Sequence, residues 1–292
     1  MSEKCRSNPS IERMVHKRQV GRLCKSWLKK KLQKLNEDKT KIIVIGSDTF
    51  TSRMKTLHNI QSVLINGHRV ELCDSVRNLG VIVDENLSFK KQIMRVVKSC
   101  NQQLKNIAFI RKYLKIHTLK ILASQQILSR IDYCNSIYYN LPTYLLKKLQ
   151  TLMNKTARMI FRKPFGEHVS PLYIQLHWLP IKARILYKLC CLVHNAIHQG
   201  LPVYLKSKLQ RVQYENTITR NCTMAYKLDQ PFANNGFGAR SFTYSAPRIF
   251  NSLPEDLRKI EDYLIFKKKL KTFFFSEAYD LVNNSTREAY KI

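Results

Sequence analysis

The chain has 292 residues, of which 51 are Lys or Arg and 20 are Asp or Glu, so its formal net charge is +31. A hydrophobic fraction of 44% excludes a charged disordered tail. The sequence has no apolar run of the ~18 residues that a membrane-spanning helix needs, and no secretory signal is visible. We therefore expect neither a membrane-spanning nor a secreted protein.

The cysteines are scattered, so we expect reduced thiols in an intracellular protein, nuclear or cytoplasmic. The charge favours a polyanion such as RNA or DNA, or an anionic membrane face, over a basic solvated surface that has no partner. Of these we expect nucleic acid and no membrane.

The first segment, residues 1–33, is a basic leader with little apolar periodicity. Clusters of Lys and Arg of this kind are typical of electrostatic arms and nuclear-import signals. The other interpretation is a frayed leader that has no partner of its own. Both interpretations stay open on the sequence alone.

Short β-type segments follow over residues 34–86. A strand is predicted from Lys41 to Ile45. Two further strands, Ser62–Ile65 and His68–Cys73, flank the pair Asn66-Gly67. Because an Asn-Gly pair tolerates the positive φ angles of a type I′ turn, this pattern predicts a β-hairpin.

The junction between strands and helices lies around the buried-looking strand Val81–Val83, which a turn at Gly80 precedes. Asp84 and Glu85 follow it directly. The spacing of these two carboxylates would allow them to bind a metal ion. The other interpretation is that they lie in a turn that precedes the helix. Ser88 is predicted to cap the following helix by accepting a hydrogen bond from a first-turn N–H group.

Three helices are predicted over residues 87–165. The first helix begins near Phe89, and its apolar residues recur at alternating four- and three-residue spacing. The second helix covers His117–Arg130, and the third begins at Pro142. The inward residues of the third helix are Leu145, Leu149, Leu152 and Met153. Basic side chains form the opposite edges of the first and third helices, and these are the candidate nucleic-acid contacts: Lys91, Arg95, Lys98 and Lys105, then Lys147, Lys155, Arg158 and Arg162.

The remaining part, residues 166–292, is also expected to be mostly helical. Residues 176–189 open a helix that ends near Gly200, and residues 211–240 predict a loop or short strands. Residues 243–258 predict a strand and a short helix divided by prolines. The last predicted helix, residues 266–275, packs four apolar side chains inward: Phe266, Leu270, Phe273 and Phe274.

Several motifs occur in the order and spacing found in reverse transcriptases of non-LTR retrotransposons, the jockey-like LINE elements, which the chain resembles from about Leu23 to Phe275. The motifs are LNEDKT (35–40), NLGVIVD (78–84), LSFKKQI (87–93), SRIDYCN (129–135), LHWLP (176–180) and APRIFNSLP (246–254). The resemblance implies an α+β, mostly helical fold. Residues 34–86 would be the remnant of a polymerase palm, 87–165 a helical thumb, and 166–292 a helical C-terminal region.

The family's activity is RNA-directed DNA polymerisation, which needs closely placed aspartates to hold two Mg²⁺ ions. This chain has no Asp-Asp pair, and Asp132 is expected to be a structural hydrogen-bonding residue. We therefore expect no cofactor and an inactive enzyme. The resemblance assigns one vestigial catalytic role, that of the general acid, to Lys39.

The resulting hypothesis is a truncated reverse-transcriptase-derived protein that binds RNA, DNA or a hybrid duplex through its basic thumb-like helices. A host-recruited adaptor that works through protein contacts, with a partner covering the exposed palm strands, is the alternative, and a non-functional pseudogene product is another. A zinc site at Cys191, His194 and His198 is also conceivable, because offsets of three and seven share a helical face. A packed core face is the competing interpretation, and no metal site is assigned.

Overall fold

The computed structural model describes residues 39–56, 62–65, 68–210, 227–233 and 236–279. The chain divides into two compact units, and the division falls between Ser88 and Phe89. The described residues are mostly helical, with two small antiparallel sheets. This confirms the predicted α+β, mostly helical class. The basic leader lies outside the described residues.

The first unit contains both sheets, each with two strands. Residues Ser62–Ile65 pair with His68–Glu71 so that Ile65 is opposite His68, which confirms the predicted hairpin strands, while Asn66-Gly67 lies outside the described residues. In the second sheet, Leu79 and Gly80 connect the strands, both with positive φ. The elements of this unit are α2 (Asp48–Thr56), β1 (Ser62–Ile65), β2 (His68–Glu71), β3 (Ser75–Asn78) and β4 (Val81–Asp84).

The strand predicted over Lys41–Ile45 is wrong. Ile42 forms an isolated parallel bridge with Leu72, and Ile45 is exposed. The next backbone hydrogen bond of this segment goes to a different residue: the N–H of Gly46 donates to the Glu85 carbonyl at 3.0 Å. The Ile42–Leu72 bridge is therefore not continued as a strand.

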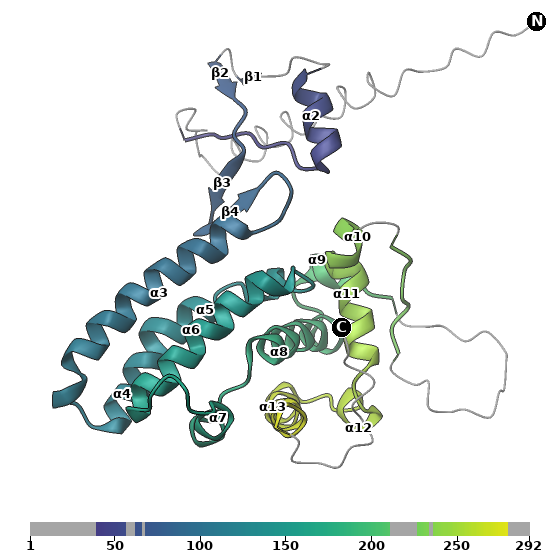
Figure 1. Cartoon of the computed structure of the whole chain (residues 1–292). Coiled ribbons are helices and arrows are strands. Elements are labelled where there is room, and N and C mark those ends of the chain that lie inside the picture. The colour runs from purple at the N-terminus through teal and green to yellow at the C-terminus, as the bar shows by residue number, and fades with distance from the viewer. Residues whose placement is uncertain (1–38, 57–61, 66–67, 211–226, 234–235, 280–292) are drawn as a thin grey trace, which may run out of the picture. The chain divides into compact units, whose positions relative to one another are not determined.

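The second unit is built of helices, and Figure 1 shows α3 and α6 side by side with α8, α11 and α13 beyond them. The run from α4 to α5 confirms the predicted second helix, and α8 with η4 confirms the helix that ends at Gly200. The helical elements are α3 (Lys90–Ile110), η1 (Arg111–Tyr113), α4 (Ile116–Ala123), η2 (Ser124–Leu128), α5 (Ser129–Asp132), η3 (Asn135–Tyr138), α6 (Thr143–Phe161), α7 (Ser170–Leu176), α8 (Ile181–His194), η4 (Asn195–Gln199), α9 (Val203–Lys206), α10 (Gly236–Arg240), α11 (Phe242–Asn251), α12 (Glu255–Arg258) and α13 (Tyr263–Ala278).

One hydrophobic core runs through the second unit, from Ile93 in α3 to Phe274 in α13. The predicted apolar stripe of α3 is confirmed, because Ile93, Val96 and Cys100 are buried. The inward residues predicted for α6 are buried as well. Helices on both sides of the boundary expected between residues 165 and 166 contribute to this core, so that boundary does not separate two cores.

The residue before α3 is Phe89, with φ 53°, so Ser88 lies one position before the residue that borders the helix. The N–H of Ser88 donates to Asp84 Oδ2 at 2.8 Å, and the role of the Ser88 hydroxyl as a cap stays a prediction.

One prediction near a proline is wrong. Residues 243–251, predicted to begin with a strand, lie in α11, which continues through Pro247 because its neighbours Ala246 and Phe250 are packed in the core.

The irregular stretch predicted over residues 211–240 lies partly outside the described residues, but Gly236–Arg240 forms α10, where a loop or strands were expected. Helix α7 was also not predicted, although Pro171 in its first turn is a start signal. None of the described helices is both long and apolar enough to cross a bilayer.

Candidate nucleic-acid interface

The two long helices of the second unit carry basic residues and no acidic ones. Between Asn86 and Gly166 the sequence contains a single acidic residue, Asp132, which lies at the end of α5. Lys and Arg on α3 and α6 therefore have no carboxylate on either helix to neutralise them. A surface of this kind attracts polyanions.

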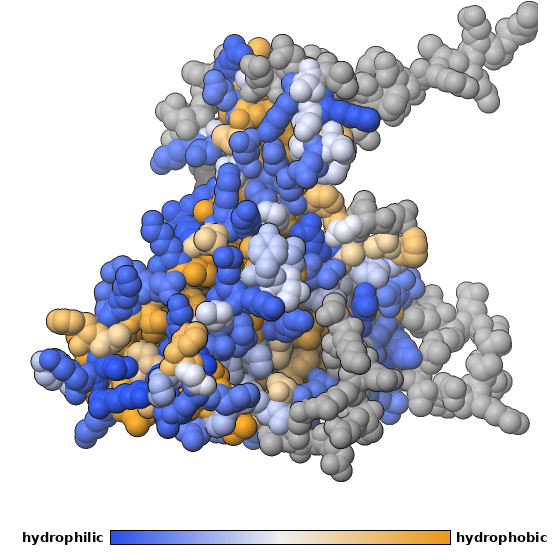
Figure 2. Space-filling model, viewed as in Figure 1, coloured by the Kyte–Doolittle hydropathy of each residue, from blue (hydrophilic) through white to orange (hydrophobic). Residues whose placement is uncertain are grey.

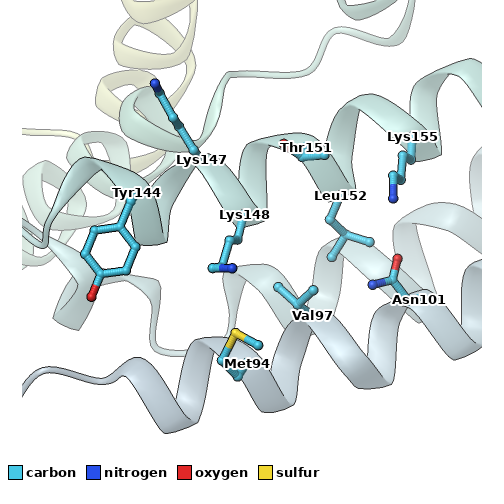
Figure 3. A pocket seen from close by; sticks show the side chains of 9 residues that line it. All are labelled: Met94, Val97, Asn101, Tyr144, Lys147, Lys148, Thr151, Leu152 and Lys155. Carbon is cyan, nitrogen blue, oxygen red and sulfur yellow. The ribbon is translucent and has the colours of Figure 1, made fainter. Parts of the chain in front are cut away.

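A groove of about 370 Å³ lies between α3 and α6. Figure 3 shows that the two helices run in the same direction, with Met94 near Lys148 at one end and Asn101 near Lys155 at the other. The side chains that line it are mostly apolar on the floor and basic along the α6 wall: Met94, Val97, Asn101, Tyr144, Lys147, Lys148, Thr151, Leu152 and Lys155.

The lysines of α6 point in different directions. In Figure 3, Lys148 and Lys155 extend toward α3, whereas Lys147 points away from it. Lys147 and Lys155 were predicted from the sequence, but Lys148 was not. Its spacing could have identified it, because Tyr144, Lys148 and Lys155 fall at offsets of four and seven and therefore share one side of the helix.

On α3, Lys98 and Lys105 each lie four residues after a groove residue, Met94 and Asn101 respectively. They are therefore one helical turn further along the same side. Both are exposed. Within the described chain, none of the four lysines at the groove forms an ion pair with a carboxylate: Lys98, Lys105, Lys148 and Lys155.

The other predicted α3 residues differ in their surroundings. Lys91 is exposed at the start of the helix, three residues before Met94. Arg95 is half-buried and acts on its neighbour Tyr138: burial raises the pKa of the Tyr138 hydroxyl, and the Gln92 side chain and the Arg95 charge offset part of that rise. Arg95 is thus less accessible to a ligand than Lys98 or Lys105.

Arg158 and Arg162, also predicted as nucleic-acid contacts, hold the end of α6. The Nη2 of Arg158 donates to the Glu167 carbonyl at 2.9 Å, and its guanidinium lies 5.2 Å from the centre of the Phe165 ring. The Nη2 of Arg162 donates to the Arg111 carbonyl at 3.3 Å. These contacts give both arginines a structural task beside any role in binding.

Lys39, the vestigial general acid implied by the resemblance, is exposed in a turn of the first unit. Also in that unit, Glu85 pairs with Lys55 at 2.8 Å, and Asp84 accepts the Ser88 N–H. These bonds favour the turn interpretation of Asp84 and Glu85 over the metal interpretation.

Asp132 forms a two-point ion pair with Arg184, and it also accepts a hydrogen bond from Asn135 Nδ2 at 3.3 Å. The expected structural role of this residue is confirmed. The three side chains line a second cavity, of about 520 Å³, beside the aromatic rings of Trp178 and Tyr187.

The helical face with Cys191, His194 and His198 is packed into the core. The His194 ring stacks on His198 and Phe266, with centroid distances of 4.4 and 4.1 Å, and its Nε2 lies 2.7 Å from the Ile260 carbonyl oxygen. In the part of the chain that the structure describes, no three His, Cys, Asp or Glu side chains converge on a metal position. These contacts favour the core interpretation of the motif.

Comparisons of the chain with models of known protein families, with curated proteins and with solved structures found no match. The α3–α6 groove is therefore interpreted through its own chemistry. It combines primary ammonium groups that form no ion pair with a carboxylate of the described residues, an apolar floor and an exposed tyrosine, Tyr144, at one end.

Proposed function

We propose that this chain binds nucleic acid through the α3–α6 groove, and that it derives from the reverse transcriptase of a non-LTR retrotransposon without a complete polymerase site. The observation that carries the binding proposal is the pairing of two acid-free helices at one groove. Lys148 and Lys155 on α6 line the groove, and Lys98 and Lys105 on α3 lie one helical turn beyond its lining residues Met94 and Asn101.

Phosphates are the natural ligands of this surface. Each phosphate that a lysine neutralises releases condensed counterions, which drives binding and makes it weaken as salt rises. Lys98 and Lys105 are seven residues apart, as are Lys148 and Lys155, so each pair spans about 10 Å along its helix. Two parallel rows of this kind would position a phosphate backbone without reading its sequence.

The proposed origin is supported by the order of the sequence motifs and by the change from strands to helices at Ser88 and Phe89. The motif NLGVIVD ends at Asp84, the last residue of β4, and LSFKKQI covers the start of α3. In a polymerase of this family the corresponding helices would belong to the thumb. The sequence itself has no Asp-Asp pair, so we propose binding and not polymerisation.

The experiment is a titration of labelled nucleic acid at several salt concentrations with two variants of equal charge. The groove variant changes Lys98, Lys105, Lys148 and Lys155 to Gln. The matched control changes four exposed lysines outside α3 and α6 to Gln: Lys182, Lys208, Lys268 and Lys269. Gln has nearly the helix propensity of Lys, so both variants should keep their helical content.

We expect the groove variant to lower the slope of log affinity against log salt by roughly 0.9 for each duplex phosphate contact, or 0.7 for a single strand. The control variant should lower it far less. Equal slopes for the two variants would overturn the proposal. An affinity that does not change with salt in the parent protein would favour the alternative, an adaptor that works through protein contacts.

A further inference from the structure

The size of the groove limits what can enter it. Its volume of about 370 Å³ is that of a small-ligand pocket. The major groove of B-DNA alone is about 12 Å wide, so a whole duplex is too large to fit into the α3–α6 groove. A duplex would rest on the lysines at the rim and leave the floor uncovered.

The floor offers contacts that a phosphate backbone cannot use. Met94 is 46% exposed and Val97 is half-buried, and these two side chains form the accessible apolar surface of the floor, whereas Leu152 beneath them is only 2% exposed. Tyr144 stands at the end of the groove near Met94 and is 55% exposed. Aromatic and apolar surfaces of this kind bind the faces of nucleic-acid bases.

Base faces are available only when the strands are separated. In a duplex each base is stacked on its neighbours and presents only its edges in the grooves. A single strand presents both phosphates and base faces, which matches a groove with lysines along its α6 wall and apolar side chains on its floor.

We infer that the ligand of the α3–α6 groove is single-stranded nucleic acid, with its phosphates on Lys98, Lys105, Lys148 and Lys155 and one base stacked on Tyr144. This inference rests on the proposed function and narrows it to one class of ligand. Tyr144 is the residue that distinguishes this ligand from a duplex, because stacking on it requires an unpaired base.

The test compares fluorescence anisotropy titrations of labelled oligouridylate, oligothymidylate and a DNA duplex of equal length. We expect both single strands to bind more tightly than the duplex. Changing Tyr144 to Ala should weaken single-strand binding about tenfold, the scale of one base–aromatic stack, without changing the salt slope. Tyr144→Phe should retain the affinity, and the control Tyr204→Ala, at a tyrosine that is 69% exposed on α9, should have no effect.

The outcomes separate this inference from the function on which it rests. If the groove lysine variant weakens binding but the duplex binds as tightly as the single strands, or if Tyr144→Ala behaves like Tyr204→Ala, the inference is wrong and the proposed function stands. If the lysine variant and its control are indistinguishable for every ligand, the proposed function itself fails. Tighter binding of RNA than DNA, or the reverse, would support the inference in either case provided that the single strand is preferred.

Discussion

Arg184 in α8 holds Asp132 at the end of α5 by two hydrogen bonds, from Nε to Oδ1 at 2.8 Å and from Nη2 to Oδ2 at 2.7 Å. The two residues are 52 positions apart in the sequence. Asp132 is the single acidic residue between Asn86 and Gly166, and this pair occupies it. The pair therefore links the helices on both sides of residue 165, and the sequences of α3 and α6 themselves contain no carboxylate.

The first prediction concerns this ion pair. Changing Asp132 to Ala leaves the guanidinium of Arg184, whose side chain is only 16% exposed, without its counter-charge. We expect the free energy of unfolding to fall by about 1–3 kcal/mol, measured by urea unfolding followed by circular dichroism. Lys163→Ala, which breaks the exposed pair with Glu167, should cost less than about 1 kcal/mol. Equal costs would show that the Asp132–Arg184 pair is no more than a surface contact.

The second prediction concerns pH. Burial lowers the pKa of His194, and the hydrogen bond to Ile260 offsets only part of that effect. The ordinary pKa, about 6.5, applies in the unfolded chain, which therefore takes up a proton first as the pH falls. The stability contributed by neutral His194 is full above this value and is lost as the pH falls below it toward the folded pKa.

This is measured by denaturant unfolding between pH 8 and pH 5 for the parent protein and for His194→Gln. We expect the variant to have lower stability at pH 8, because ring packing is lost, but a weaker decline toward low pH. His117→Gln, at an exposed histidine of α4, is the control and should keep the parent's decline. A decline that survives in His194→Gln would assign the pH dependence to another group.

The third prediction tests whether the second unit has one core. Phe266 in α13 is fully buried, so Phe266→Ala should cost about 3–5 kcal/mol. Leu149→Ala in α6 should cost about 2–5 kcal/mol and shift the same unfolding transition. Phe232→Ala is the control, because this ring is 90% exposed. Two separate transitions, each sensitive to one variant, would instead favour a domain boundary near residue 165.

The fourth prediction is that the purified chain does not extend a primer with Mg²⁺ or Mn²⁺. The reason is the absence of an Asp-Asp pair from the sequence, since two metal ions need closely placed carboxylates. Incorporation of nucleotides is measured on a primed template. Template-dependent incorporation that persists through purification and disappears on changing Lys39 to Ala would contradict it.

The helical part of the fold was predictable because its signals are long and regular. The stripe with Ile93, Val96 and Cys100 repeats over most of α3, and α6 repeats the same pattern. Such periodicity depends only on which side of a helix is buried. Exposed lysines on the opposite side followed from the same pattern, which is why Lys98 and Lys155 were identified correctly as surface residues.

Short elements depend on single contacts, and here prediction failed. Helix α2 was not expected, although the Phe50 N–H donates to Ser47 Oγ and Asp48 stands in the first turn, both of which are helix-start signals. The strand predicted over Lys41–Ile45 is reduced to one isolated bridge, between Ile42 and Leu72. Local sequence does not reveal such an outcome, because it shows residues suited to a strand and not the partner that the fold brings to them.

The groove itself could not be predicted, because it depends on how α3 packs against α6. Met94 and Tyr144 are far apart in the sequence and lie at the same end of the groove only because the two helices run in the same direction. The sequence analysis names Lys147 and not Lys148 as a nucleic-acid contact, because the sequence alone does not show which of the two neighbouring lysines faces α3. Helix packing decides that Lys148 points toward α3 and Lys147 away from it.

Photocrosslinking shows whether the α3–α6 groove is the nucleic-acid-binding surface. A single-stranded oligonucleotide that carries photoreactive bases is irradiated in complex with the full chain, and the crosslinked peptides are identified by mass spectrometry. If the groove binds the strand, crosslinks form in the two segments that contain its lining residues and lysines, Met94–Lys105 and Tyr144–Lys155, and they are lost in the groove lysine variant. Crosslinks confined to the leader, residues 1–33, or to the basic helix α13 would contradict it.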